Sequence, residues 1–485
     1  MNKSYQSSKS IDYLLIAKGF AEPPITCVRM ASLALVPGII AAIVAFLRSP
    51  QQALLNVYLP VLLMVPEYYR WTVPLLPKLT PSHSAIMGII VIAVVRKKLK
   101  WRFSLTDALV IAIVVGISIS EYTNTGYKEA QNLTFDMLAW LLFPYLATKI
   151  FVEPLGLRVI FARRIAILMF AVSMVSLYEF RLGRTLFRVP FDPFFAGQGS
   201  GWVTTFRWGF ARIAGPYGHA ILAGVVMIIG YRIQKWLEWG GHWERSFKRF
   251  PGLPWSKAKI ISYGIIAGSV MTMCRGPWMG GGVAALVIGV GRSRNRKLAI
   301  RIALAGLLLI GVPAAVSFYS YISVGRAHAT SVSQETAAYR KELMDKYTDI
   351  AMEHSVLGWG RNTWPKVAGM ESIDNYYLQL TLMHGVTATS LLLAIIVTMM
   401  VRLGRRGARS GYRTDEANLA FTLLSCYAAI AFSIATVYMG NQLLPLFAVL
   451  TGWSEGFLTA PARQTVKAGA ATAPLMPLRF QRVVT

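Results

Sequence analysis

Apolar stretches of roughly 20 residues recur along nearly the whole chain, and this feature restricts the possible folds more than any other. A helix rises ~1.5 Å per residue, so such a stretch crosses the ~30 Å hydrocarbon core of a bilayer. Inside that core every backbone polar group needs a partner, which a helix supplies within its own segment. The alternating pattern of membrane β-strands is absent. The sequence therefore predicts an all-α, polytopic transmembrane helical bundle.

The predicted spans follow one another with short connections, except at two places. They run approximately over 30–47, 53–66, 83–96, 104–120, 133–149, 163–180, 216–233, 260–274, 278–291, 299–320, 378–401, 417–437 and 441–458. The two exceptions are the connections 181–215 and 321–377. The prediction is about 12–13 helices with one long, partly helical periplasmic loop.

Positive charge marks the side of the membrane on which each connection lies. The chain has 50 Lys and Arg against 22 Asp and Glu, a net charge of +28, which suggests nucleic-acid binding at first sight. Most of these cations, however, gather in clusters beside apolar runs, as the positive-inside rule predicts for cytoplasmic loops. The clusters are 96–102, 149–164, 232–259, 292–301, 402–413 and the tail from Arg463. We therefore predict a membrane topology and no nucleic-acid partner.

With these clusters inside, the connections 181–215 and 321–377 and the turn at Arg275 lie outside. Strict alternation then places the N-terminus outside, although its lysines favour the inside, so the count stays at 12 or 13. The predicted organisation is an N-terminal segment, ten helices, a large periplasmic loop, the C-terminal helices and a cytoplasmic tail. Their respective bounds are 1–29, 30–320 with the outer loop 181–215, 321–377, 378–458 and 459–485.

The loop 321–377 is too long for a simple connection and contains a helix-like run over Ser333–Glu353. Loops beyond ~15 residues are usually functional or disordered, and the Tyr and Trp residues here argue against disorder.

The three cysteines, Cys27, Cys274 and Cys426, show no pair spacing. Neither a disulfide framework nor a metal site is predicted.

Arginine is concentrated on the predicted outer side, where the positive-inside rule disfavours it. The segment 181–215 carries a single acid, Asp192, against Arg181, Arg184, Arg188, Arg207 and Arg212. A guanidinium is a planar fork of donors that suits bidentate binding of phosphate. These arginines, above all Arg207 and Arg212 just before a span, are candidates for binding a lipid diphosphate. Contact with lipid headgroups or simple loop solvation is the alternative.

Five further residues are candidates, each with a structural alternative. Arg275 lies in a tight turn between two spans, where a charge faces a cavity or snorkels to the interface. His219 opens a span, where a single histidine is usually structural. His354 and Arg361 frame a Gly-Trp-Gly turn. Asp374 lies where the loop returns to the membrane, and is either a base for a sugar hydroxyl or a helix N-cap.

Four segments together resemble the superfamily of O-antigen ligases and Wzy-type O-antigen polymerases, which act on bacterial envelope glycans. They are FARIAGPYGHAILAG (210–224), MCRGPWMG (273–280), AMEHSVLGWGRNTW (351–364) and IDNYYLQLTLMHG (373–385). Each segment is short, but their order, spacing and common membrane face make the resemblance specific. It covers roughly residues 200–400, with similar hydropathy over nearly the whole chain.

The resemblance implies a metal-independent glycosyltransferase without cofactors in the bacterial inner membrane. Its donor would be a polyprenyl-diphosphate-linked oligosaccharide on the periplasmic side, and a glycan hydroxyl its acceptor. Arg207 or Arg212 matches the arginine before the family's Gly-Pro segment. Arg275 matches its Ser-Arg-Gly turn, with Cys274 in place of serine. His354 matches its His-Pro turn, with serine in place of proline.

In this assignment Asp374, Arg275 and His354 are the catalytic candidates, while Arg207, Arg212, Arg361 and His219 bind the diphosphate. Ligases acting on lipid A-core usually have histidine where this chain has Asp374. Polymerisation of exopolysaccharide or O-antigen is therefore favoured over ligation. A transporter or flippase of lipid-linked glycans, and a scaffold for polysaccharide assembly proteins, are the alternatives. Partners are the bilayer, the lipid-linked donor, the acceptor and, as candidates, other assembly proteins.

Overall fold

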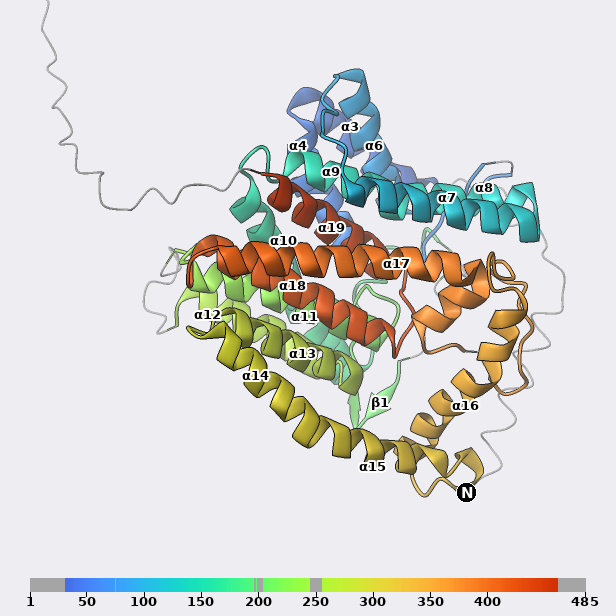
Figure 1. Cartoon of the computed structure of the whole chain (residues 1–485). Coiled ribbons are helices and arrows are strands. Elements are labelled where there is room, and N and C mark those ends of the chain that lie inside the picture. Colours follow the sequence, from blue (N-terminus) through green and yellow to red (C-terminus); the bar gives the residue numbers. More distant parts are fainter. Residues whose placement is uncertain are drawn as a thin grey trace, which may run out of the picture.

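The structure, a computed structural model, describes residues 31–74, 76–195, 198, 204–244, 255–370 and 372–460. The predicted N-terminal segment, the tail beyond Ala460 and Cys27 lie outside the described residues. The described part is helical apart from one two-stranded hairpin (Figure 1). The predicted all-α fold is confirmed.

Most helices follow one another through short connections. They are α3 (Val36–Leu47), α4 (Pro50–Ala53), α5 (Leu59–Met64), α6 (Pro81–Val95), α7 (Leu105–Thr125), α8 (Tyr127–Met137), α9 (Phe143–Phe151), α10 (Arg158–Leu182), α11 (Ala220–Trp239), α12 (Lys257–Met271), α13 (Arg275–Gly291), α14 (Arg296–Gly306), α15 (Val312–Ser323), α16 (Val332–Glu353), α17 (Tyr376–Arg409), α18 (Asp415–Ile434) and α19 (Leu443–Thr459). The short turns are η1 (Ser32–Leu35), η2 (Leu54–Tyr58), η3 (Leu138–Leu142), η4 (Leu307–Gly311) and η5 (Arg326–His328). The strands are β1 (Phe206–Arg207) and β2 (Phe210–Ala211).

Each predicted span coincides with helix in the structure. Within the part of the chain that the structure describes, seven helices are long and apolar enough to cross a membrane, so the chain is a multi-pass membrane protein. They are Leu105–Thr125, Tyr127–Phe151, Arg158–Leu182, Ala220–Trp239, Arg296–Ser323, Tyr376–Arg409 and Asp415–Ile434. Shorter apolar helices cover Ser32–Leu47, Pro81–Val95 and Leu443–Thr459. The total of 12 or 13 crossings stays a prediction.

Helix boundaries follow local capping chemistry. Ser104 and Asp107 form a reciprocal capping box at the start of α7, and Thr80 caps α6 immediately before Pro81.

Small residues allow helices to pack closely. A Cβ on Gly88 of α6 would lie only 2.4 Å from the carbonyl oxygen of Gly38 in α3. These two helices can therefore approach to backbone contact, as membrane helices with small residues do.

Four of the predicted inner clusters of basic residues converge at one end of the bundle. Lys149 donates to the carbonyl of Arg102, which joins the clusters 96–102 and 149–164. Arg296 donates to the carbonyl of Ala408, which joins 292–301 to 402–413. Helix ends that are far apart in sequence therefore share one face. This arrangement agrees with the alternation predicted from charge.

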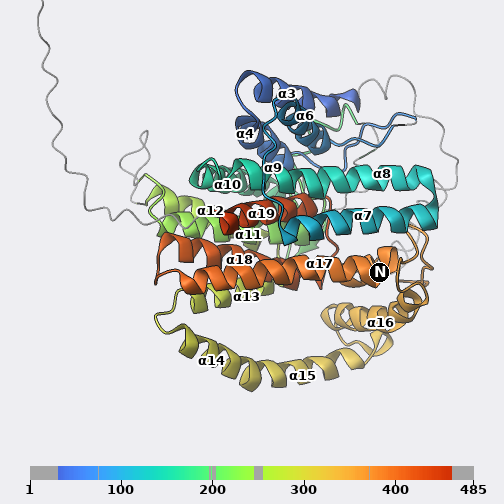
Figure 2. The same cartoon turned by 45° about the horizontal axis from the view of Figure 1, so that its top comes forward.

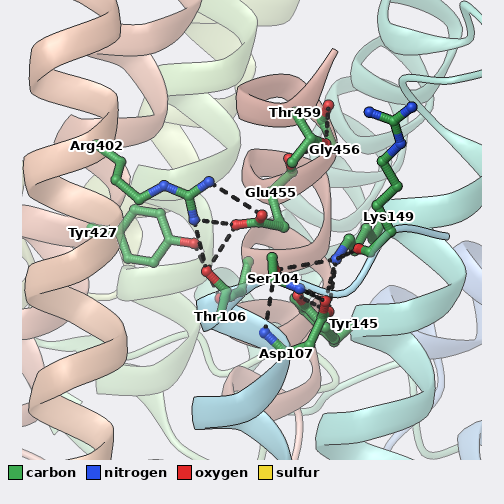
Figure 3. A network of polar contacts seen from close by, with 12 residues as sticks. Ser104, Thr106, Asp107, Tyr145, Lys149, Arg402, Tyr427, Glu455, Gly456 and Thr459 are labelled. Atoms are coloured by element: carbon green, nitrogen blue, oxygen red, sulfur yellow. Dashed lines mark hydrogen bonds and ion pairs between the residues drawn. The ribbon is translucent and has the colours of Figure 1, made fainter.

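Charged side chains tie the helices together at that end (Figure 3). Lys149 of α9 donates to Asp107 of α7 at 2.6 Å, and Arg402 of α17 contacts Glu455 of α19. Thr106 of α7 donates to Glu455 at 2.8 Å, which connects the two pairs into one region. The carboxylates are fully buried and paired, the condition under which buried charge is tolerated.

The first described helix packs beside α6 at the start of the chain. The Arg96 guanidinium lies 4.6 Å from the ring centre of Phe46, so the end of α3 is close to the end of α6, which is predicted to lie inside. At its other end, Ala34 packs beside Tyr69 and Phe195 in connections that are predicted to lie outside. The orientation of the N-terminus stays a prediction.

Two peripheral elements frame the outer end. The continuous helix of α14, η4 and α15 lies at the edge of the bundle in both views, and its apolar face is exposed (Figure 2). Helix α16 then folds back from the end of α15 toward the start of α17. It covers the stretch Ser333–Glu353, for which the sequence predicts a helix.

Candidate functional site

The outer arginines begin on a tight hairpin. Strands β1 and β2 pair antiparallel, and Trp208 and Gly209 form the two-residue turn between them. Both residues have positive φ, 52° and 79°, as type I′ turns require. The hairpin places Arg207 at its end and Arg212 directly after its second strand.

These arginines contact the turn between α12 and α13. Arg207 donates to the carbonyl of Met273 at 2.6 Å, and Arg212 donates to the carbonyl of Thr272 at 3.2 Å. A second nitrogen of Arg212 lies 2.7 Å from the sulfur of Cys274. Two segments about 60 residues apart in sequence are therefore joined directly before Arg275.

A cavity of about 730 Å³ opens at this junction. Its walls come from the hairpin region, the start of α13, the ends of α15 and α18, and one face of α16. The lining residues are Arg207, Arg212, Ile221, Cys274, Arg275, Gly276, Met279, Phe318, Tyr321, Ile322, Thr336, Ala337, Arg340, Lys341, Met344, Phe432 and Thr436. One part of the lining is basic and the other apolar, as a ligand with an anionic head and a lipid tail needs.

The electrostatics of the cavity favour an anion. Burial, together with the neighbouring charges of Arg212 and Arg275, lowers the pKa of Arg207. No acidic residue is among the described residues that line the cavity. The cavity also lies at the N-terminus of α13, where the helix dipole attracts negative charge.

Two basic residues on the loop helix complete the cavity, and the sequence analysis did not select them. Arg340 and Lys341 reach the lining from α16. The Nε of Arg340 is buried and has no hydrogen-bond partner in the described structure, whereas Lys341 pairs with Asp345 at 3.0 Å. The available signal was an adjacent Arg-Lys pair on the outer loop, but sequence alone could not show which way that pair faces.

His219 and Asp374 lie beside the arginine cavity rather than in its lining. His219 caps α11, where its Nδ1 accepts from the N–H of Ile221 at 3.2 Å. Burial lowers the pKa of His219, Arg212 acts in the same direction, and the nearby Asp374 carboxylate opposes both. The N-cap of α17 is Asn375, not Asp374. The structural alternative for Asp374 is thereby removed.

His354 and Arg361 lie elsewhere on the outer face. His354 is exposed at the end of α16 and its ring rests 3.8 Å, centre to centre, from that of Trp359. Arg361 pairs with the buried Asp136 of α8 at 3.2 Å. Neither lines the arginine cavity, so their predicted roles in catalysis and diphosphate binding stay predictions without support from this geometry.

Residues 260–393 match the family model of the O-antigen ligase, Wzy_C. This segment is an O-antigen ligase domain. The match runs from α12 into α17 and therefore includes Arg275, all of α16 and Asp374, while Arg207 and Arg212 precede it. No curated protein matches the chain. The match supports the predicted resemblance and covers three of its four segments, since 210–224 precedes it, and it supports a membrane enzyme of the O-antigen ligase/polymerase type.

Proposed function

We propose that the protein transfers a glycan from a polyprenyl-diphosphate-linked donor to an acceptor hydroxyl at the periplasmic face of the bacterial inner membrane. One observation carries the proposal. Arg207, Arg212 and Arg275, which belong to different segments, line one cavity whose described lining has no acid. A site lined by several guanidinium groups and by no carboxylate among its described lining residues is suited to a doubly phosphorylated head group.

The lipid part of the donor has its own place in this arrangement. Met279, Phe318, Ile322 and Phe432 line the same cavity and supply an apolar wall beside the arginines. Phe318 and Ile322 belong to α15 at the periphery, so this wall faces the lipid side of the bundle (Figure 2). The diphosphate would contact the arginines while the polyprenyl chain contacts the apolar wall.

The proposed reaction is a displacement at the anomeric carbon. The acceptor oxygen forms the new bond to that carbon, and the bond from the carbon to the diphosphate breaks. The hydroxyl proton passes to Asp374, the candidate base beside the cavity. Negative charge builds on the leaving diphosphate, where the arginines stabilise it by fixed electrostatic contacts. The proposed transfer uses no metal ion, a prediction that comes from the family resemblance.

Polymerisation is the favoured outcome, because Asp374 replaces the histidine usual in ligases that act on lipid A-core. Analysis of surface glycans in a deletion strain separates the two activities. Short unpolymerised repeats indicate a polymerase, whereas full-length polymer left on its lipid carrier indicates a ligase.

Substitution of the arginines tests the proposed function. Purified protein receives lipid-linked donor on its outer face, and new glycosidic bonds and released lipid diphosphate are measured. We expect Arg212→Ala and Arg275→Ala each to lower the rate by ~100-fold or more, the usual effect of removing one donor that stabilises developing charge. Arg405→Ala, on the predicted inner side, is the matched control and should retain the rate.

Unchanged rates in both outer variants would contradict the proposed function. Movement of the donor across the membrane without new glycosidic bonds would instead favour a transporter. Loss of polymer only when the entire protein is deleted, with both arginine variants active in cells, would favour a scaffold.

A further inference from the structure

A second hollow region lies beside the arginine cavity, along the connection between α18 and α19. It consists of a cavity of about 270 Å³ and one of about 160 Å³. The larger is lined by residues that include Glu67, Tyr68, Tyr217, Asn441 and Gln442. The smaller is lined by residues that include Arg361, Tyr376, Gln379, His384 and Asn441. Tyr438 and Asn441 line both cavities, which therefore adjoin at this pair.

The connection that holds Tyr438 also borders the proposed reaction centre. Thr436, two residues earlier, lines the arginine cavity. The Tyr438 ring lies 6.4 Å from that of His219, centre to centre, and within electrostatic range of Asp374. The second region thus adjoins the arginine cavity along the connection that holds Thr436 and Tyr438.

Hydrogen-bond acceptors without partners are built into the walls of this region. Both carboxylate oxygens of Glu67 are buried and have no partner that meets hydrogen-bond geometry in the described residues, although the hydroxyls of Thr80 and Ser82 lie nearby. Nε2 of His384 is likewise buried and unpaired. Its Nδ1 lies 3.0 Å from the hydroxyl of Ser120. Such groups are rare in native proteins because each one costs ~1–3 kcal/mol, and they commonly indicate a missing partner.

Accessible amides lie between these buried acceptors. The side-chain amides of Asn441 and Gln379 are half-buried and form no side-chain hydrogen bond within the part of the chain that the structure describes. The side-chain amide nitrogen of Gln442, by contrast, already donates hydrogen bonds to the carbonyls of Val65 and Pro216. A planar amide both donates and accepts, which matches the adjacent hydroxyls of a sugar.

The remaining lining selects the class of ligand. Arg361 and the nearby Arg70 both pair with Asp136, so the surroundings are not acidic enough to favour a cation. The rings of Tyr376 and Tyr438 offer apolar faces beside the polar groups. Pockets for drug-sized ligands occupy ~300–1,000 Å³, so these smaller volumes correspond to a fragment such as a single sugar ring.

We propose that the region around Tyr438 and Asn441 binds a neutral sugar residue of the acceptor glycan, with Asn441 hydrogen-bonded to its hydroxyls. This proposal rests on the proposed function, since it places the acceptor beside the donor site, along the connection that holds Thr436 and Tyr438. Asp374 would then be close to both substrates. Asn441 is a binding residue in this arrangement, and the reacting groups remain those of the donor site.

Two probes test the acceptor site separately from the donor site. Full-length protein in nanodiscs is titrated with a panel of methyl hexopyranosides, including an N-acetylated one, and binding is followed by saturation-transfer NMR. Binding of farnesyl diphosphate, a short polyprenyl diphosphate, is measured on the same samples. We expect at least one glycoside to bind the native protein, and Asn441→Ala and Asn441→Asp to weaken that binding tenfold or more. Asn362→Ala, an exposed amide of the outer loop, is the matched control.

The variants distinguish failure of this proposal from failure of the proposed function. Asn441→Ala should keep farnesyl diphosphate binding, which also shows that it is folded, whereas Arg212→Ala should lose it and keep glycoside binding. If no glycoside binds, or if binding is unchanged in both Asn441 variants, the acceptor site is wrong. If Arg212→Ala keeps diphosphate binding, the donor site is wrong, whatever Asn441 does.

Discussion

The carboxyl group of Glu67 shows how burial at the outer end of the bundle changes the ionisation of a single residue. Glu67 lies three residues beyond α5 and is 1% exposed. Burial raises its pKa to about 7, although Arg70 and nearby hydroxyl and indole groups act in the opposite direction. The ionised form is therefore disfavoured in the folded protein.

This pKa shift predicts a stability that depends on pH. Because the folded pKa lies above the ordinary value of 4.5, ionisation destabilises the fold as pH rises from about 4.5, and the loss is complete above about 7. Glu67→Gln keeps the neutral form at every pH. Its stability relative to the native protein should increase by roughly 3 kcal/mol between pH 4.5 and pH 8. Thermal unfolding of both proteins in detergent at pH 4.5 and pH 8 measures this difference in stability. The same difference at both pH values would show that the pKa of the Glu67 carboxyl is not raised in the folded protein.

At the scale of elements, the outer loop is fixed to the bundle through a break in α17. The helix is interrupted at His384 and at Gly385, which has φ of 76°. The Gly-Trp-Gly turn lies against this break, where Trp359 and Gly360 donate to the carbonyls of Leu382 and Met383. The loop thereby occupies backbone groups that an unbroken helix would use internally.

Because the loop and α17 are in close contact at this break, adding a single methyl group at Gly385 should strongly destabilise the fold. A Cβ on Gly385 would lie 2.1 Å from the carbonyl oxygen of Val356, so Gly385→Ala suffers both a clash and positive φ. Gly369 has φ of 73° but open space around it, so Gly369→Ala suffers only the backbone cost of ~1–2 kcal/mol. We expect Gly385→Ala to lose at least twice as much unfolding free energy.

Thermal unfolding and protease resistance of the loop measure both glycine variants. Gly282→Ala, with negative φ and nothing nearby, controls for the extra methyl group in a helix. Equal losses for Gly385→Ala and Gly369→Ala would mean that the loop does not contact α17 as closely as the structure places it.

At the scale of the whole molecule, charge and function are separated along the bundle. Four basic clusters share one end of the bundle, and α16, which lines the arginine cavity, lies at the other end (Figure 1). The proposed donor site is therefore at the end opposite the one predicted to contact the cytoplasm. A donor bound there would reach the protein from one side of the membrane only.

Cysteine accessibility tests this orientation. In a background without the native cysteines, Ala327→Cys in the outer loop and Ala408→Cys at the inner end are both exposed. A membrane-impermeant maleimide should label only Ala327→Cys in cells with a permeable outer membrane, and label both after the inner membrane is disrupted. Labelling of Ala408→Cys alone in intact cells would invert the proposed topology.

The sequence by itself determined the helices and their approximate bounds, and it predicts the side on which each connection lies. Hydrophobic length and the distribution of Lys and Arg are one-dimensional signals, and the bilayer acts on each segment nearly independently. The sequence also identified three candidate arginines in this way, namely Arg207, Arg212 and Arg275, because arginine on the predicted outer side is unusual wherever it occurs in the fold. Of the three, only Arg275 lies within the family match over residues 260–393, and the roles of all three stay predictions.

Only the tertiary structure decided which of the candidates meet. It brought three arginines together with Arg340 of α16, and paired Arg361 with Asp136 more than 200 residues away. It assigned the N-cap of α17 to Asn375, and showed Glu67, His384 and Asn441 around a second hollow region. The physical reason is that such proximity depends on helix packing and on the path of the loop, and pairs so distant leave no periodic or compositional signal in one sequence.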